Sequence, residues 1–296
     1  EVNPVTLSWR ETFGGAKRLV GLGSAFMWSG LLTAGLDMAT RSLITREYGI
    51  DAAGFYQAAW ALSGMFAGFI LSAMGADFYP RLTSVIEDHE QAMRTVNEQT
   101  EIGMLLALPG LLATLAFAPL VIELLYSKAF LPAAELLPWF LLGVFGRVVS
   151  WPLGFIQLAK GAARWFAATE TVFIIIQLGL MVSLVHAYGV VGAAYGFAIT
   201  YLLYTMGMLW VGRMLIGFRW SASVKRLLQG TSALVLLAAG LIGLFPGGAG
   251  MMLAGLVALG GGVVSLRGLS SRLGLDHPLI RSALRLPGGK WVLSSR

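Results

Sequence analysis

The chain of 296 residues is 57% apolar and only 12% charged, carries a net charge of +6, and contains no cysteine. So few charged side chains cannot coat a water-soluble globule of this size, which leaves lipid as the natural solvent for its surface. The lack of cysteine excludes disulfides and thiolate metal sites, and the three histidines stand far apart without ligand spacing. We therefore expect no metal, no other cofactor and no nucleic-acid partner.

The chain begins at Glu1 with a polar segment that contains Arg10, Lys17 and Arg18. The apolar run that follows is long enough to cross a bilayer and is too long for the core of a signal peptide. We interpret residues 1–17 as a cytoplasmic connection cut from a longer transporter-like protein, with the missing portion before residue 1.

Eight apolar segments then follow along the chain. A hydrocarbon core of about 30 Å needs roughly 20 helical residues, and every backbone polar group inside it must find an internal partner. The sequence therefore predicts an all-α, polytopic transmembrane helical bundle of about eight spans, at Leu19–Leu43, Ala53–Met74, Ile102–Leu125, Ala133–Ala159, Trp165–Ala187, Val190–Ile216, Thr231–Phe245 and Met251–Leu266.

The polar stretch Ser84–Glu101 separates the second and third spans. Val85, His89, Met93 and Val96 recur in it at helical spacing, which is typical of an interfacial helix or of an extension of the flanking spans. A solvated cytoplasmic hairpin is the simpler interpretation, and we favour it.

Most of the 21 lysines and arginines fall in alternate connections when both ends of the chain are placed in the cytoplasm. Because cytoplasmic loops carry the excess of positive charge, this pattern predicts an N-in, C-in protein of the cytoplasmic (inner) membrane. Residues 267–296 then form a basic cytoplasmic tail, which we expect to lie against anionic lipid head groups.

Several short motifs resemble those of the Wzx polysaccharide flippases, or O-antigen translocases. These belong to the multidrug/oligosaccharidyl-lipid/polysaccharide (MOP) exporter superfamily. The resemblance covers roughly residues 15 to 230 and rests on Tyr48–Gln57, Ala76–Leu82, Val96–Glu101, Leu124–Ser127, Arg147, Trp151–Pro152 and Ala159–Gly161.

The resemblance implies a MATE-like transporter built from two six-helix lobes around a central cavity. Residues 18–216 would be the second lobe, and residues 217–266 a cytoplasmic linker with two additional C-terminal helices. Such a protein moves an undecaprenyl-diphosphate-linked oligosaccharide between leaflets by alternating access, usually coupled to an ion gradient, either H⁺ or Na⁺. Its partners would be this lipid-linked substrate, membrane lipids, the coupling ion and the missing N-terminal lobe of the same chain.

Arg147 lies deep within the fourth predicted span. A charge at the bilayer centre costs about 2.5 to 3.5 kcal/mol on insertion scales, so it normally faces a bundle interior or water. A guanidinium matches the oxygens of a diphosphate, which predicts a substrate-binding role. An ion pair or a carbonyl-bonded helix lock is the equally weighted structural alternative.

Two further groups of charges lie in the first and fifth spans. Asp37 and Arg41 are four residues apart, so they share a helix face and could simply pair with each other. The functional alternative makes Arg41 a second substrate contact and Asp37 a gate or coupling carboxylate. Glu170, with Gln177 on the same face, could carry a proton, or it could pair with a cation at the interface.

Near the predicted inner boundary, Asp77 and Lys160 are candidates for a gate and for a substrate contact at entry. Interface anchoring is the simpler account of these charges. Trp60 and Trp151 lie deeper, where stacking on a sugar competes with ordinary core packing as an explanation.

Three alternative functions remain to be weighed. A drug or peptidoglycan-precursor exporter of the same superfamily would share this architecture. A membrane-embedded glycan polymerase or ligase would need a sizeable outward segment with acid/base groups, but the outer connections here are short and contain no histidine. A purely structural membrane subunit would not explain the deep Arg147. We therefore expect a transporter and not an enzyme.

Overall fold

The computed structural model describes residues 9–245, 247–274 and 281. These residues form α-helices with one short 3-10 helix and no strand, in the order α1 (Trp9–Val85), α2 (His89–Leu125), η1 (Lys128–Phe130), α3 (Ala133–Ala159), α4 (Ala163–Tyr188), α5 (Val191–Ile216), α6 (Ala222–Leu244) and α7 (Gly248–Leu273). The predicted all-α polytopic bundle is confirmed.

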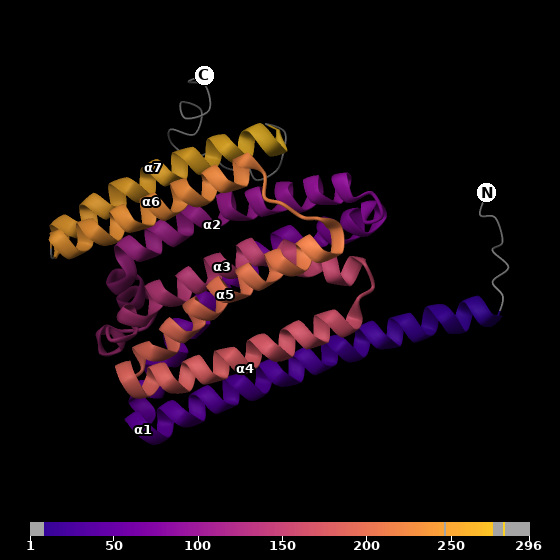
Figure 1. The fold of residues 1–296 in the computed structure, drawn as a ribbon. Coiled ribbons are helices and arrows are strands. Elements are labelled where there is room, and N and C mark those ends of the chain that lie inside the picture. The colour runs from indigo at the N-terminus through magenta and orange to yellow at the C-terminus, as the bar shows by residue number, and fades with distance from the viewer. Residues whose placement is uncertain (1–8, 246, 275–280, 282–296) are drawn as a thin grey trace.

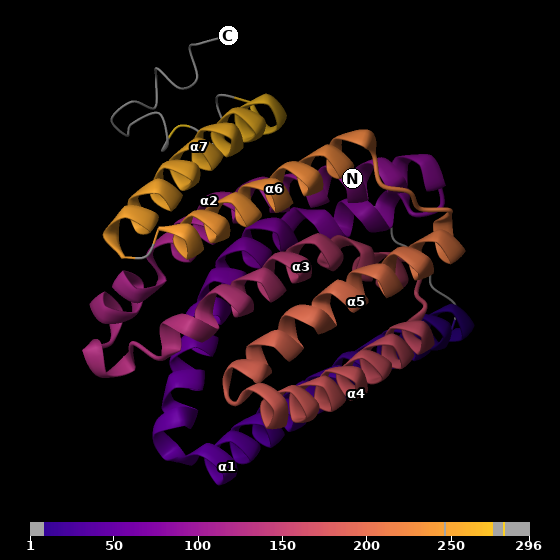
Figure 2. The ribbon, with the colours of Figure 1, turned by 60° about the vertical axis from the view of Figure 1, so that its left-hand side comes forward.

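Helix α1 is two helices joined at a sharp bend. Gly49 adopts φ 87° and ψ 173°, which only glycine tolerates readily, and it divides α1 into a first limb (residues 9–48) and a second limb (residues 50–85). The predicted spans Leu19–Leu43 and Ala53–Met74 lie in these two limbs. Figure 2 shows the first limb running along α4 and the second limb turning away from it.

Among the described residues, seven helices are long and apolar enough to cross a membrane. The first of these stretches, Gly23–Ser72, is 50 residues long and contains the bend at Gly49, so it supplies two crossings. Eight crossing segments result, as the sequence predicts. The last two are longer than expected, because α6 already begins at Ala222 and α7 continues to Leu273.

The stretch Ser84–Glu101 is not a solvated hairpin. Helix α1 continues to Val85, and α2 begins at His89, where the Asp88 carboxylate caps it by accepting hydrogen bonds from the backbone N–H groups of Glu90 and Gln91, both at 3.1 Å. The last part of the stretch is buried. It therefore extends the two flanking spans beyond the apolar region.

The helices lie in layers, which Figure 1 shows. Helices α3 and α5 pack against each other in the middle, because Gly143 and Gly146 of α3 leave room for Phe197 and Tyr201 of α5. Helix α4 and the first limb of α1 lie on one side of this pair. On the other side, α6 and α7 cover α2, where Gly261 of α7 sits against Leu112 of α2.

The predicted domain boundaries fall differently from the helix ends. Helix α1 begins at Trp9, inside the expected connection of residues 1–17, and α7 runs to Leu273, inside the expected basic tail. Residues 1–8 of the connection, and residues 275–280 and 282–296 of the tail, lie outside the described residues. The six helical segments between residues 18 and 216 are the two limbs of α1 and helices α2 to α5.

Candidate functional site

A cavity of about 340 Å³ lies between the first limb of α1, α3, α4 and α5. Much of its wall is aromatic, and the polar side chains come from all four helices. The aromatic residues are Phe26, Trp60, Trp151, Phe155, Phe166, Phe173, Phe197, Tyr201 and Tyr204, and the polar ones are Ser29, Thr33, Asp37, Arg147, Ser150, Glu170, Gln177 and Thr200. The cavity falls within the usual size range of small-ligand sites.

Arg147 projects from the middle of α3 into this cavity. The residue is exposed although its helix neighbours Val148 and Val149 are buried. Its guanidinium carbon lies 6.0 Å from the ring centroid of Tyr201, within the range of a cation–π contact. No carboxylate among the described residues lies within 4.0 Å of it. An ion-pair lock therefore does not account for Arg147.

Glu170 of α4 supplies a carboxylate to the same cavity. One oxygen accepts a hydrogen bond of 2.8 Å from the Ser29 hydroxyl of α1, and the other accepts one of 2.9 Å from the Tyr204 hydroxyl of α5. Three helices therefore meet at this carboxylate. The expected face partner Gln177 also lines the cavity.

Asp37 stands at a boundary. It lines the cavity, and it also lines an open hollow of about 570 Å³ on the exposed face of the first limb, beside Arg41 and Arg46. Both Arg41 and Arg147 act on it electrostatically. Asp37 and Arg41 do not form an ion pair within 4.0 Å, so the structure does not show the two side chains paired with each other.

Comparison with known proteins gives three agreeing results. A family model described as "Polysaccharide biosynthesis protein" matches residues 2–135. A putative O-antigen transporter of Shigella flexneri is 25% identical over 197 residues, which is 66% of this chain and 46% of that protein. The lipid III flippase of Escherichia coli K12 is 24% identical over 168 residues, or 55% of this chain and 39% of that protein.

Solved structures show the same fold. An outward-facing MATE family transporter of the MOP superfamily superposes on 94% of this chain and 68% of its own, with a TM-score of 0.58 and 15% identity. A MOP superfamily transporter from Pyrococcus furiosus gives a TM-score of 0.50 at 14% identity over the same shares. The predicted resemblance is confirmed: in sequence the chain is similar to an O-antigen transporter and a lipid III flippase, and in fold it is similar to transporters of the MOP superfamily. The chain spans less than half the length of the two curated relatives it matches.

Two of the residues predicted for the site lie outside the cavity. Lys160, at the end of α3, pairs with Glu87 at 3.3 Å, and Asp77 pairs with Arg81 at 3.5 Å. The structure thus brings Arg147, Asp37 and Glu170 together, leaves Arg41 on the adjoining open face, and places Lys160 and Asp77 near the end of the bundle where α1 turns into α2.

Most of the residues that line the cavity could not be predicted from the sequence. Tyr201 and Tyr204, which contact Arg147 and Glu170, were not singled out, and neither was Ser29. Their sequence positions do not distinguish them, because an aromatic residue of a spanning helix has the same spacing whether it packs in the core, anchors the helix at the membrane surface or binds a ligand. Trp60 and Trp151 do line the cavity, and both also pack on core rings.

No group of three or more histidine, aspartate or glutamate side chains suited to a metal ion occurs in the part of the chain that the structure describes. The chemical resources of the cavity are therefore one unpaired guanidinium, two carboxylates, several hydroxyls and a set of aromatic faces. Such a set has the chemistry needed to contact an anionic or glycan-bearing molecule by charge, hydrogen bonding and stacking.

Proposed function

We propose that this chain is part of a flippase that moves an undecaprenyl-diphosphate-linked oligosaccharide across the cytoplasmic membrane by alternating access. The observation that carries the proposal is the Arg147 guanidinium, which lies without a carboxylate partner in an aromatic cavity halfway along a spanning helix. The relatives are named as an O-antigen transporter and a lipid III flippase, which agrees with this substrate class.

The physical reason is that a diphosphate head group must cross a region that disfavours charge. A guanidinium offers several N–H donors in a planar arrangement that matches phosphate oxygens, and its interaction strengthens where water is scarce. An arginine held there without a partner costs about 2.5 to 3.5 kcal/mol on insertion scales, and an anionic ligand offsets this cost. The aromatic wall formed by Trp60 and Trp151 suits the sugar that follows the diphosphate.

Coupling to an H⁺ or Na⁺ gradient would fall to the carboxylates. Glu170 receives two hydroxyl hydrogen bonds, and Asp37 faces both the cavity and the open hollow, so either could exchange a cation as access alternates. Arg41 beside the hollow would be a second phosphate contact. Lys160 and Asp77 would act at entry, near the end of the bundle, and not in the cavity.

The complete transporter in this proposal pairs the lobe formed by residues 18–216 with a further, N-terminal lobe. The exposed face of the first limb, with Asp37 and Arg41, would then border the space between the lobes. We propose the N-in, C-in topology for the chain, since that arrangement places most lysines and arginines in the cytoplasm.

A multidrug exporter is the second candidate function. The apolar, aromatic wall of the cavity and the likeness of the fold to a MATE family transporter favour it. The two candidates differ in what Arg147 does, because an apolar or cationic drug gains nothing from a guanidinium.

The test is Arg147→Ala in the full-length protein, in cells that need it for their surface glycan. Surface glycan should disappear while membrane insertion, followed with a fluorescent fusion, stays normal, and Arg147→Lys should restore only part of the activity. Arg94→Ala is the matched control, because Arg94 pairs with Glu90 on an exposed helix face away from the cavity. Unchanged glycan export by Arg147→Ala would remove this residue from the substrate site.

A further inference from the structure

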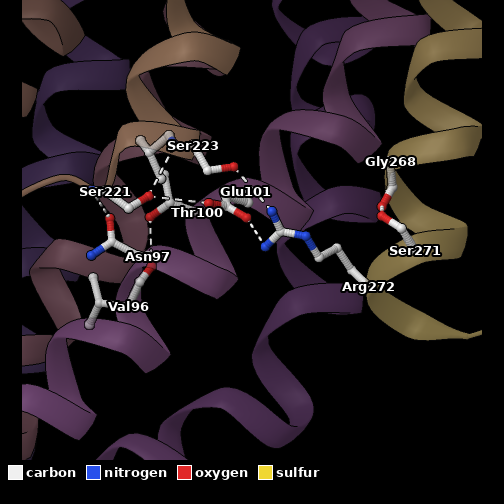
Figure 3. Close-up of polar contacts among 10 residues, drawn as sticks. Val96, Asn97, Thr100, Glu101, Ser221, Ser223, Gly268, Ser271 and Arg272 are labelled. Atoms are coloured by element: carbon white, nitrogen blue, oxygen red, sulfur yellow. Dashed lines mark hydrogen bonds and ion pairs between the residues drawn. The ribbon is translucent and has the colours of Figure 1, made fainter.

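The elbow between α5 and α6 (residues 217–221) is fixed by one buried side chain and by hydrogen bonds to α2. Phe218 is fully buried, and Ser221 caps α6 by accepting a hydrogen bond of 3.1 Å from the backbone N–H of Val224. The Asn97 side chain of α2 donates to the backbone carbonyl of Arg219 at 3.1 Å and accepts from the backbone N–H of Ser221 at 2.8 Å. Figure 3 shows Asn97 reaching Ser221 beside the Glu101–Arg272 ion pair. The backbone that carries Arg219 is therefore fixed.

Two arginines share one hollow at this elbow. Arg213, in the last turn of α5, and Arg219 border a space of about 470 Å³ together with Gly217. Both residues are exposed, and neither has a carboxylate within 4.0 Å among the described residues. Arg219 also borders a groove that contains Glu98, but the two do not form an ion pair at that distance. Two unpaired like charges fixed around one hollow repel each other, and a bound anion would relieve this repulsion.

The arginine hollow lies at the head of an apolar column on α5. Met206 and Arg213 are seven residues apart, hence on the same helix face, and Trp210 lies between them. Met206 is 56% exposed and Trp210 57% exposed, so both turn toward the surrounding medium. A tryptophan below a pair of cations at the end of a spanning helix is typical of the membrane–water boundary. This column favours an anion attached to an acyl chain over a free one.

We infer that Arg213 and Arg219 form a binding site for the phosphate of an anionic membrane phospholipid, whose acyl chain lies along Met206 and Trp210. The site is separate from the cavity around Arg147, which lies halfway along the spanning helices. It concerns a resident lipid and not the transported substrate, so it stands or falls independently of the proposed function.

The experiment measures lipid retention by native mass spectrometry on the purified protein in neutral detergent. Added phosphatidylglycerol should be retained, because it carries a net negative charge, whereas phosphatidylcholine should not, because its choline ammonium neutralises the phosphate charge. The detergent is neutral so that it adds no charged surface that attracts lipid nonspecifically. Arg213→Gln/Arg219→Gln should weaken phosphatidylglycerol retention by at least about tenfold, since each lost charge-assisted hydrogen bond contributes more than a neutral one. Lys225→Gln/Arg226→Gln, which removes two nearby cations that do not line the hollow, should retain the lipid like the unchanged protein.

Two further arms separate the sources of the anion. Inorganic phosphate in excess should not displace the lipid, and Trp210→Ser should weaken lipid retention although it leaves both arginines in place. The three variants should keep the fold, because the substituted side chains are exposed, and an unchanged thermal unfolding midpoint checks this. Retention of phosphatidylglycerol by the Arg213→Gln/Arg219→Gln variant equal to that of the unchanged protein, or displacement of the lipid by excess inorganic phosphate, would overturn the lipid site.

Discussion

The charged side chains on the two sides of the α3–α5 pair differ in whether they form ion pairs. On the α2–α6–α7 side, Glu101 is only 4% exposed at its side chain, and it pairs with Arg272 of α7 and accepts a hydrogen bond from the Ser221 hydroxyl at 3.2 Å. Arg272 also donates to the Ser223 hydroxyl at 3.1 Å, so the helices α2, α6 and α7 are joined at one point (Figure 3). On the cavity side, Arg147 lies 6.0 Å from the ring centroid of Tyr201 and shares the cavity with Asp37 and Glu170, but no carboxylate of the described residues lies within 4.0 Å of it.

This difference separates structural charge from charge available to a ligand. A buried pair whose donors and acceptors meet each other holds helices in register and leaves nothing for a third molecule. A guanidinium left open in a cavity contributes little to the fold and is free to bind. Substitutions at Arg272, Glu170 and Arg147 should therefore change the stability of the protein by decreasing amounts.

Arg272→Ala should destabilise the protein most. It leaves the nearly buried Glu101 without its partner, and breaking a buried pair costs roughly 3 to 5 kcal/mol, with the lower end expected because the Arg272 side chain is 37% exposed. Thermal unfolding in detergent, followed by size-exclusion chromatography, measures the loss.

Two variants control for this effect. Glu101→Leu/Arg272→Met replaces the pair by apolar side chains and should be nearly neutral. Arg94→Ala removes an exposed i,i+4 pair and should cost no more than about 0.5 kcal/mol. A single Arg272→Ala variant as stable as Arg94→Ala would show that the Glu101–Arg272 pair does not hold the helices.

Glu170→Gln should have an intermediate effect on stability and a large one on transport. The amide oxygen still accepts one hydroxyl hydrogen bond, so the loss is about 1 kcal/mol, the net contribution of one hydrogen bond. Thr171→Val is the matched control, because it removes the neighbouring hydrogen bond from Trp28 without changing a charge. If transport in an ion-gradient assay fell equally in both variants, Glu170 would belong with the structural contacts.

Arg147→Met should leave stability unchanged or raise it by roughly 0.5 kcal/mol, as replacement of a site residue by one that suits its apolar surroundings often does. Transport should be lost in the same variant. The unfolding midpoint and a surface-glycan assay are measured on one preparation. A destabilisation as large as that of Arg272→Ala would instead assign Arg147 to the helix packing.

Sequence reasoning predicted the fold and part of the site for physical reasons. Apolar runs long enough to cross a bilayer gave all eight segments, and the cost of charge at membrane depth singled out Arg147, Asp37 and Glu170, which do share one cavity. Span order and helix faces are local properties that composition and spacing reveal.

The contacts that join distant segments could not be predicted. Glu101 and Arg272 lie 171 residues apart in sequence. The stretch Ser84–Glu101 has the composition of a solvated hairpin, and its Ala92 and Val96 are buried because Phe218, far away in the sequence, packs with them. The bend at Gly49 has no signature that distinguishes it from the many other glycines of the chain. Tyr201 and Tyr204 face the cavity only because Gly146 lets α5 approach α3 closely.

The position of Asp37 places one carboxylate beside two spaces. Its side chain lines both the cavity and the open hollow, so a rotation of this side chain can turn the carboxylate toward one space or the other. Side chains change rotamer in picoseconds to nanoseconds, whereas helices rearrange in microseconds or longer. The charge of Asp37 can therefore change its surroundings faster than the helices themselves rearrange.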